Sequence, residues 1–159
     1  MLGMGLLGTV HTLIGLTALL LGIVISLAKG RIRIAEGSGK AYALLTAITC
    51  LTSLGIYEHG GFGKPHVLAI LTLLALAFAV TVEVKHLFSR NGARISAVAW
   101  SLTILFHLIP GVTETSTRLP LGAPLLPNAD APQLQVAYLG LFALFCLGAF
   151  FQVRHIKAA

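Results

Sequence analysis

Long apolar runs constrain this chain more than any other feature of its sequence. Five such stretches are separated only by shorter segments that carry glycine, proline or charge. A helix needs about 20 mostly apolar residues to cross the roughly 30 Å hydrocarbon core of a membrane. The runs predict transmembrane spans at about residues 2–28, 41–57, 65–87, 95–112 and 134–153, with a proline-rich outer connection over 111–133.

Composition agrees with lipid as the surrounding solvent. Only 10% of the 159 residues are charged, and the mean hydropathy is +0.92, whereas a soluble domain carries roughly a quarter charged residues. The apolar runs lack the alternation of barrel strands, and a helix satisfies its backbone polar groups internally. We therefore predict one all-α domain over residues 1–159, an integral membrane bundle of about five helices.

The basic residues predict an orientation. Nine Lys or Arg residues fall in the first and third connections and the C-terminal tail, while the other side carries Lys64 and Arg118. Short cytoplasmic loops are enriched in Lys and Arg, so we expect the N-terminus outside and the C-terminus in the cytoplasm, across a bacterial inner membrane. Anionic membrane lipid, rather than nucleic acid, is the expected partner of the net charge of +6.

No common catalytic motif is present. The two cysteines, Cys50 and Cys146, lie in predicted spans, which excludes a disulfide framework and a CxxCH haem attachment site. The sequence also lacks GxSxG, Walker-type and HExxH patterns. Whether the chain catalyses any reaction is left open.

Histidines give the clearest chemical signal. Four of the six, His11, His59, His66 and His107, gather toward the outer side in the predicted topology. At 1.5 Å per residue, His11 and His107 lie on the order of 10 Å below the outer surface. Ionisable residues at such depth indicate function by default. The alternative is that each imidazole hydrogen-bonds a neighbouring helix.

Glycines share a helix face with the first histidine. Gly8, Gly15 and Gly22 repeat at heptad spacing, and His11 lies three residues after the first and four before the second. Such a smooth face accommodates a flat macrocycle whose iron His11 binds. Close packing of small residues between helices explains the same pattern.

A haem with two histidine ligands needs imidazoles on two helices, at similar depth and facing each other across the porphyrin. His11 and His107 best meet the condition of depth, and His66 is the alternative partner. Lys64 and Arg118, near the outer surface, can pair with the haem propionates. The sequence thus predicts haem b near the outer, periplasmic face.

A second candidate is a metal site at the outer surface. Glu58, His59 and His66 lie in one short stretch, and imidazole with carboxylate suits zinc or copper. Lys64 opposes metal binding electrostatically. The structural alternative is a glycine-rich hairpin with Pro65 opening the next helix.

Three acidic residues carry further expectations. Glu83, near the cytoplasmic end of the third span, is expected to pair with Lys85 or another basic residue. Glu58 and Glu114, close to the histidine layer, are either solvated or proton acceptors for quinol oxidation.

Several of these features resemble a known group of proteins. A histidine in the first span, a basic loop leading to Gly39-Lys40-Ala41-Tyr42, and the Gly-Gly-Phe-Gly-Lys-Pro-His entry to a long apolar helix resemble a family of uncharacterised bacterial multi-pass membrane proteins. More loosely, they are similar to small b-type cytochromes of the cytochrome b561 and ferric-reductase kind. The similarity covers roughly the first ninety residues. This chain has Gly37-Ser38 where the uncharacterised proteins often carry His-Arg.

The cytochrome resemblance implies a bis-histidine haem b and electron transfer with quinone or a redox partner protein. It carries over only His11, His66 and His107 as ligands. The alternative is a non-catalytic accessory subunit that packs against other membrane subunits, or against copies of itself, through the face of Gly8, Gly15 and Gly22. A transporter is less favoured because proline is expected only at span ends.

Overall fold

The computed structural model describes residues 5–57 and 61–156, and the described part is all-α. Its five α-helices confirm the all-α part of the prediction. They are α1 (Leu6–Lys29), α2 (Gly37–Leu54), α3 (Lys64–Val84), α4 (Gly92–Arg118) and α5 (Pro132–His155), with a short 3₁₀ helix, η1 (Ser89–Asn91), before α4.

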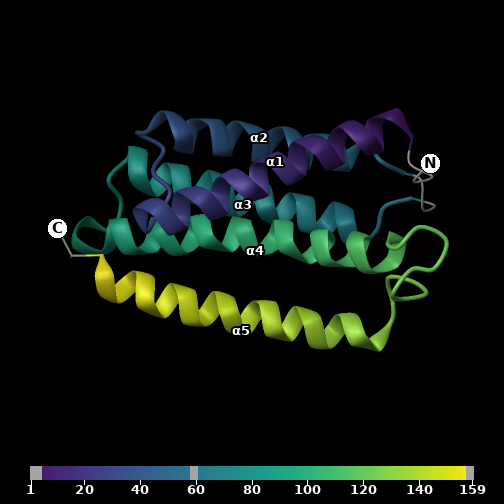
Figure 1. Cartoon of the computed structure of the whole chain (residues 1–159). Helices are drawn as coiled ribbons and strands as arrows, with labels where there is room; N and C mark the ends of the chain where they lie inside the picture. Colours follow the sequence, from purple (N-terminus) through teal and green to yellow (C-terminus); the bar gives the residue numbers. More distant parts are fainter. Residues whose placement is uncertain (1–4, 58–60, 157–159) are drawn as a thin grey trace.

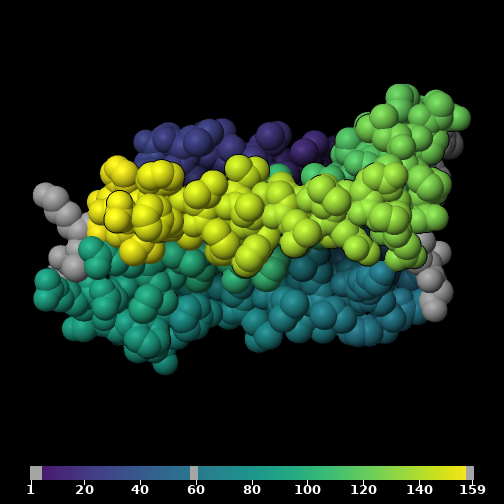
Figure 2. Space-filling model, turned by 90° about the horizontal axis from the view of Figure 1, so that it is seen from below, coloured from purple at the N-terminus to yellow at the C-terminus, as the bar shows by residue number. Residues whose placement is uncertain are grey.

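Four helices form a bundle and the fifth lies beside it. Helix α1 packs against α2 and α4, and α3 packs against the same two helices, whereas α5 packs only against α4 (Figure 1). Figure 2 shows α5 lying across one face of the molecule. Successive helices run in opposite directions, so the N- and C-termini lie at opposite ends of the bundle (Figure 1).

The two ends differ in charge. We call the end where α1, α3 and α5 finish the basic end, and the other the distal end. The described Lys and Arg residues at the basic end are Lys29, Arg31, Arg33, Lys40, Lys85, Arg90, Arg94 and Arg154, and those at the distal end are Lys64 and Arg118.

Four helices, α1, α3, α4 together with η1, and α5, are long and apolar enough to cross a membrane. Helix α2 is not among them. Its 18 residues include threonines and serines that reduce its mean hydropathy.

Local signals account for several helix ends. Gly30 closes α1 in the left-handed conformation, with φ of 74°, and its N–H donates to the Ser26 carbonyl. Pro65 opens α3, as predicted, because a first-turn residue needs no N–H partner. Gly63 precedes α3 and donates its N–H to His66 Nδ1 at 3.2 Å.

Helix α4 corrects the predicted outer loop. The prediction ended the fourth span at residue 112 and placed proline only at span ends, but α4 continues through Pro110 to Arg118. Thr113 and Thr117 donate their hydroxyls to carbonyls four residues earlier, and Glu114 pairs with Arg118. Pro110 cannot donate to the Phe106 carbonyl, yet the helix continues past it for two more turns.

Other helix boundaries also differ from prediction. Helix α2 begins at Gly37 rather than 41 and ends at Leu54 rather than 57, whereas α3 ends at Val84 rather than 87. After α3, the Leu87 N–H bonds the Val82 carbonyl, and His86 takes a positive φ, which stops the helix.

The core of the bundle centres on Tyr42 of α2. Its side chain is fully buried, its ring meets Trp100 edge-on with centroids 5.9 Å apart, and its hydroxyl lies 2.7 Å from Thr103 Oγ1. The interior therefore contains a polar contact between α2 and α4, which lie diagonally across the bundle.

Candidate functional site

His11 is held by helix α2. Its Nδ1 lies 3.0 Å from the Thr49 carbonyl oxygen and 3.0 Å from Thr52 Oγ1. The carbonyl only accepts, and the Thr52 hydroxyl donates to the Ile48 carbonyl at 2.9 Å. The proton of a neutral His11 therefore sits on Nδ1, which leaves a lone pair on Nε2.

His107 of α4 is held in the same way by its own helix. Its Nδ1–H donates to the Thr103 carbonyl oxygen at 2.9 Å, so its Nε2 also carries a lone pair. The side chain is only 8% exposed, and within residues 5–57 and 61–156 its Nε2 has no hydrogen-bond partner. A buried polar atom without a partner calls for an explanation.

His66 takes the opposite protonation. Its Nδ1 accepts the Gly63 N–H, so the proton of the neutral ring sits on Nε2. This Nε2 is also buried without a partner in the described part of the chain. The ring lies between Tyr57 and Phe62, with centroid separations of 5.0 and 5.2 Å. His66 thus presents a donor where His11 and His107 present lone pairs.

The two lone-pair histidines contact α2 at different levels. His11 contacts Thr49 and Thr52, whereas the His107 ring lies 6.3 Å from that of Tyr42. Thr49 and Tyr42 are about two helical turns apart on α2. The contacts with α2 therefore indicate that the two imidazoles lie at different depths, whereas the sequence predicted equal depth.

Side chains of α2 fill the glycine face of α1. A methyl group at Gly15 would lie 3.1 Å from Thr49 Cγ2, and one at Gly22 would lie 2.6 Å from Tyr42 Cε2. Gly8 is buried on the same helix. Close packing within the chain explains Gly15 and Gly22, so this face is not open to another subunit.

The expected propionate partners already have acidic neighbours. Lys64 Nζ lies 2.7 Å from Asp130 Oδ1, and both side chains are strongly exposed. Arg118 pairs with Glu114 one turn earlier on α4. The Lys64 ammonium lowers the pKa of Asp130.

The predicted outer metal site lies mostly beyond the described residues. Glu58 and His59 are outside them, and only His66 is described. Among residues 5–57 and 61–156, no group of three or more His, Cys, Asp or Glu side chains is arranged to hold a metal ion.

Glu83 has different partners from those expected. Its Oε1 accepts the Trp100 indole N–H at 2.6 Å, and its Oε2 accepts the Ile34 backbone N–H at 2.9 Å. The predicted pairing with Lys85 was wrong, because a buried indole N–H needs an acceptor. A single acidic residue ending an apolar helix, with one tryptophan in the chain, is the signal that sequence reasoning missed.

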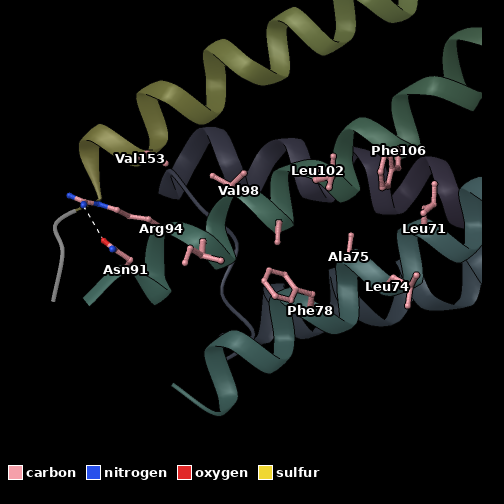
Figure 3. Close-up of a pocket in the computed structure, with 12 residues that line it drawn as sticks. Leu71, Leu74, Ala75, Phe78, Asn91, Arg94, Val98, Leu102, Phe106 and Val153 are labelled. Atoms are coloured by element: carbon pink, nitrogen blue, oxygen red, sulfur yellow. Dashed lines mark hydrogen bonds between the residues drawn. The ribbon is translucent and has the colours of Figure 1, made fainter. Parts of the chain in front are cut away.

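An apolar groove runs between α3, α4 and α5. It has a volume of about 770 Å³ and is lined by Leu and Phe side chains such as Leu74, Phe78, Leu102 and Phe106. Figure 3 shows Arg94 and Asn91 at one end of the groove, joined by a hydrogen bond. The groove exists because α5 packs against α4 alone.

Comparison with known proteins adds no relative. No family model matches the chain, and no curated protein or solved structure matches it either. The resemblance to uncharacterised membrane proteins and b-type cytochromes stays a prediction.

Proposed function

We propose that this chain is a membrane-embedded electron-transfer protein that binds one haem b in the half of the bundle containing His11 and His107. The observation that carries the proposal is the buried Nε2 of His107, which has no partner in the described part of the chain. Iron bound at this atom would supply the missing partner.

The hydrogen bonds of both histidines support a metal-binding role. A histidine that binds a metal almost always donates its other ring N–H to a carbonyl, carboxylate or water, which sets the tautomer. His107 does so to Thr103, and His11 does so to Thr49. A simple packing role for His107 leaves the desolvation of Nε2 without compensation.

Haem binding requires a change in side-chain packing. The Tyr42 ring lies beside His107 and against Gly22, in the space that a porphyrin between α1 and α4 would need. We therefore expect Tyr42 to move when haem binds. Tryptophan emission from Trp100, whose ring meets Tyr42, should change on loading.

The proposed setting is a bacterial inner membrane. All five helices would cross it, with the basic end in the cytoplasm and the N-terminus outside. Helix α2 would cross shielded by α1 and α3, which explains its lower hydropathy. The haem would then lie toward the outer face, where quinone or a redox protein can exchange electrons with it.

A second candidate is a non-catalytic subunit of a larger membrane complex, and one observation favours it. The most apolar window of α5 is 0% buried within the chain. That face is available for lateral contact with other membrane helices, although lipid covers such a face equally well.

The test is an absorption spectrum of the detergent-purified protein, oxidised and then reduced with dithionite, with haem quantified against protein. We expect a sharp reduced α-band at about one haem per chain. His107→Ala should remove most of the haem, and His11→Ala should lower its content and alter the spectrum.

His155→Ala is the matched control. His155 also bonds a carbonyl four residues earlier through Nδ1, but it is exposed at the basic end. Its replacement should leave haem content unchanged. A colourless, folded protein, or equal haem in all three variants, would overturn the proposal.

A further inference from the structure

A pocket of about 750 Å³ lies at the basic end, away from His11, His66 and His107. The α1–α2 connection contributes Arg31 and Arg33, and the α3–α4 connection contributes His86 and Arg90. These two connections lie at the same end of the bundle (Figure 1). Three arginines from two separate connections therefore line one pocket.

The pocket has an excess of positive charge. Its one lining carboxylate, Glu83, is occupied by the Trp100 and Ile34 N–H groups. Arg33 Nε lies 3.4 Å from Glu36 Oε1. Within residues 5–57 and 61–156, Arg31 and Arg90 form no ion pair.

Two close backbone contacts hold the connections in place. A Cβ atom at Gly39 would overlap the Arg33 carbonyl oxygen, and one at Gly92 would overlap the Leu87 carbonyl oxygen. Glycine at these positions lets each connection press against the start of the following helix. The arginines thus extend from a fixed backbone rather than from loose loops.

The α3–α4 connection is also strained. His86, Phe88 and Ser89 have φ of 51°, 60° and 43°, a region that side chains other than glycine and asparagine rarely adopt. Strained residues of this kind cluster at functional sites. The first turn of α4, where Gly92 and Ala93 line the pocket, adds the partial positive charge of a helix N-terminus.

We infer that this pocket binds a phosphate group, supplied by the headgroup of an anionic phospholipid or by free phosphate. A guanidinium group can bind two phosphate oxygens at once through paired N–H donors. A lysine ammonium acts only as a point charge. The pocket lies where apolar helices end, at the depth of lipid headgroups. Ser89 also lines the pocket and carries a hydroxyl group.

The inference is independent of haem. It requires only the packing of the two connections, and none of the lining residues belongs to the histidine site. Haem content should therefore be unchanged in variants of the pocket.

The experiment uses the full-length protein, delipidated in neutral detergent, with two probes. One is phosphatidylglycerol, titrated and followed by native mass spectrometry against phosphatidylcholine. The other is inorganic phosphate, followed by calorimetry. The test variant is Arg31→Gln with Arg90→Gln.

The matched control is Lys40→Gln with Lys85→Gln, which removes the same charge from the same end outside the pocket lining. We expect phosphatidylglycerol to bind about tenfold more weakly to the arginine variant and within about twofold of the original affinity to the lysine variant. Circular dichroism should show that both variants are folded.

The probes also separate the two sources of phosphate. Binding of phosphatidylglycerol that inorganic phosphate does not displace assigns the pocket to a lipid headgroup, and calorimetric binding of phosphate that displaces the lipid assigns it to free phosphate. Binding of neither probe would overturn the inference. Equal losses in the arginine and lysine variants would overturn it too, because the effect would then be general surface charge.

Discussion

Helices α2 and α5 differ in how their sequences relate to their places in the bundle. Helix α5 is long and apolar, yet no residue in its most apolar window is buried, and α4 is the only helix against which it packs. Helix α2 is less apolar, yet it places Tyr42, Thr46, Thr49 and Cys50 in the interior. Of these two helices, the more apolar one is therefore the less buried.

The lipid solvent proposed above would account for this difference. In water an apolar side chain gains free energy by turning inward, but lipid tails are as apolar as leucine, so an apolar face gains little by being buried. Small and polar residues gain more, because they allow close approach and interhelical hydrogen bonds. Between α2 and α5, the more polar helix is therefore the interior one.

The largest expected effect is the loss of the Tyr42 ring. Tyr42→Ala removes the packing against Gly22 and Trp100 and the hydrogen bond to Thr103, and should lower the free energy of unfolding by about 3–5 kcal/mol. Phe142→Ala on the exposed face of α5 should change it by less than about 0.5 kcal/mol. Unfolding in mixed micelles, followed by circular dichroism, measures both free energies. Equal losses in the two variants would contradict the difference in burial between α2 and α5.

Added volume gives a smaller effect. Gly22→Ala places a methyl group 2.6 Å from Tyr42 Cε2 and 3.2 Å from Ile104 Cγ1. Such overpacking should cost about 1–3 kcal/mol. Gly140→Ala on α5 meets no atom within 4 Å and should be neutral or stabilising. Similar destabilisation by both alanines in the micelle assay would show that α5 is buried by a partner.

Next in size is the polar contact that joins α5 to α4. Tyr138 of α5 lies with its hydroxyl 2.6 Å from Thr113 Oγ1. Tyr138→Phe should cost about 0.6 kcal/mol, the average for a hydrogen bond between membrane helices. Hydrogen exchange should become faster in α5 and stay unchanged in α2. Faster exchange throughout the chain would mean that α5 unfolds together with the bundle.

The smallest effect concerns the ion pair at the start of α2. Lys29, by its hydrogen bond and charge, lowers the pKa of Glu36, with further contributions from Arg33 and Arg31. Because the folded pKa lies below the unfolded one, the pair stabilises the protein above the unfolded pKa, and this contribution is lost as pH falls through the folded pKa.

Glu36→Gln tests that contribution. The thermal midpoint of the original protein should fall slightly more than that of the variant on acidification. The difference should be small because the pair is exposed and screened by water and salt. Identical acid responses would show that the pair contributes nothing to stability.

Much of the candidate site was visible in the sequence, although its geometry was not. Intramembrane depth singled out His11 and His107, and both side chains hydrogen-bond within the bundle. The tautomers follow from which carbonyl each Nδ1 meets, and for His11 that carbonyl belongs to Thr49, 38 residues away. No local pattern encodes such a contact.

The sequence by itself determined the all-α class, the approximate helix positions and the separation of basic residues to one end. These properties depend on the length, hydropathy and charge of short stretches of chain, each of which can be evaluated without the rest of the sequence. Only the tertiary structure decided that α4 continues past Pro110 and that α2 fills the glycine face of α1. It also decided that the connections before α2 and α4 pack closely against Gly39 and Gly92. These outcomes depend on close contacts between residues distant in the chain, which the pattern within any one helix does not contain.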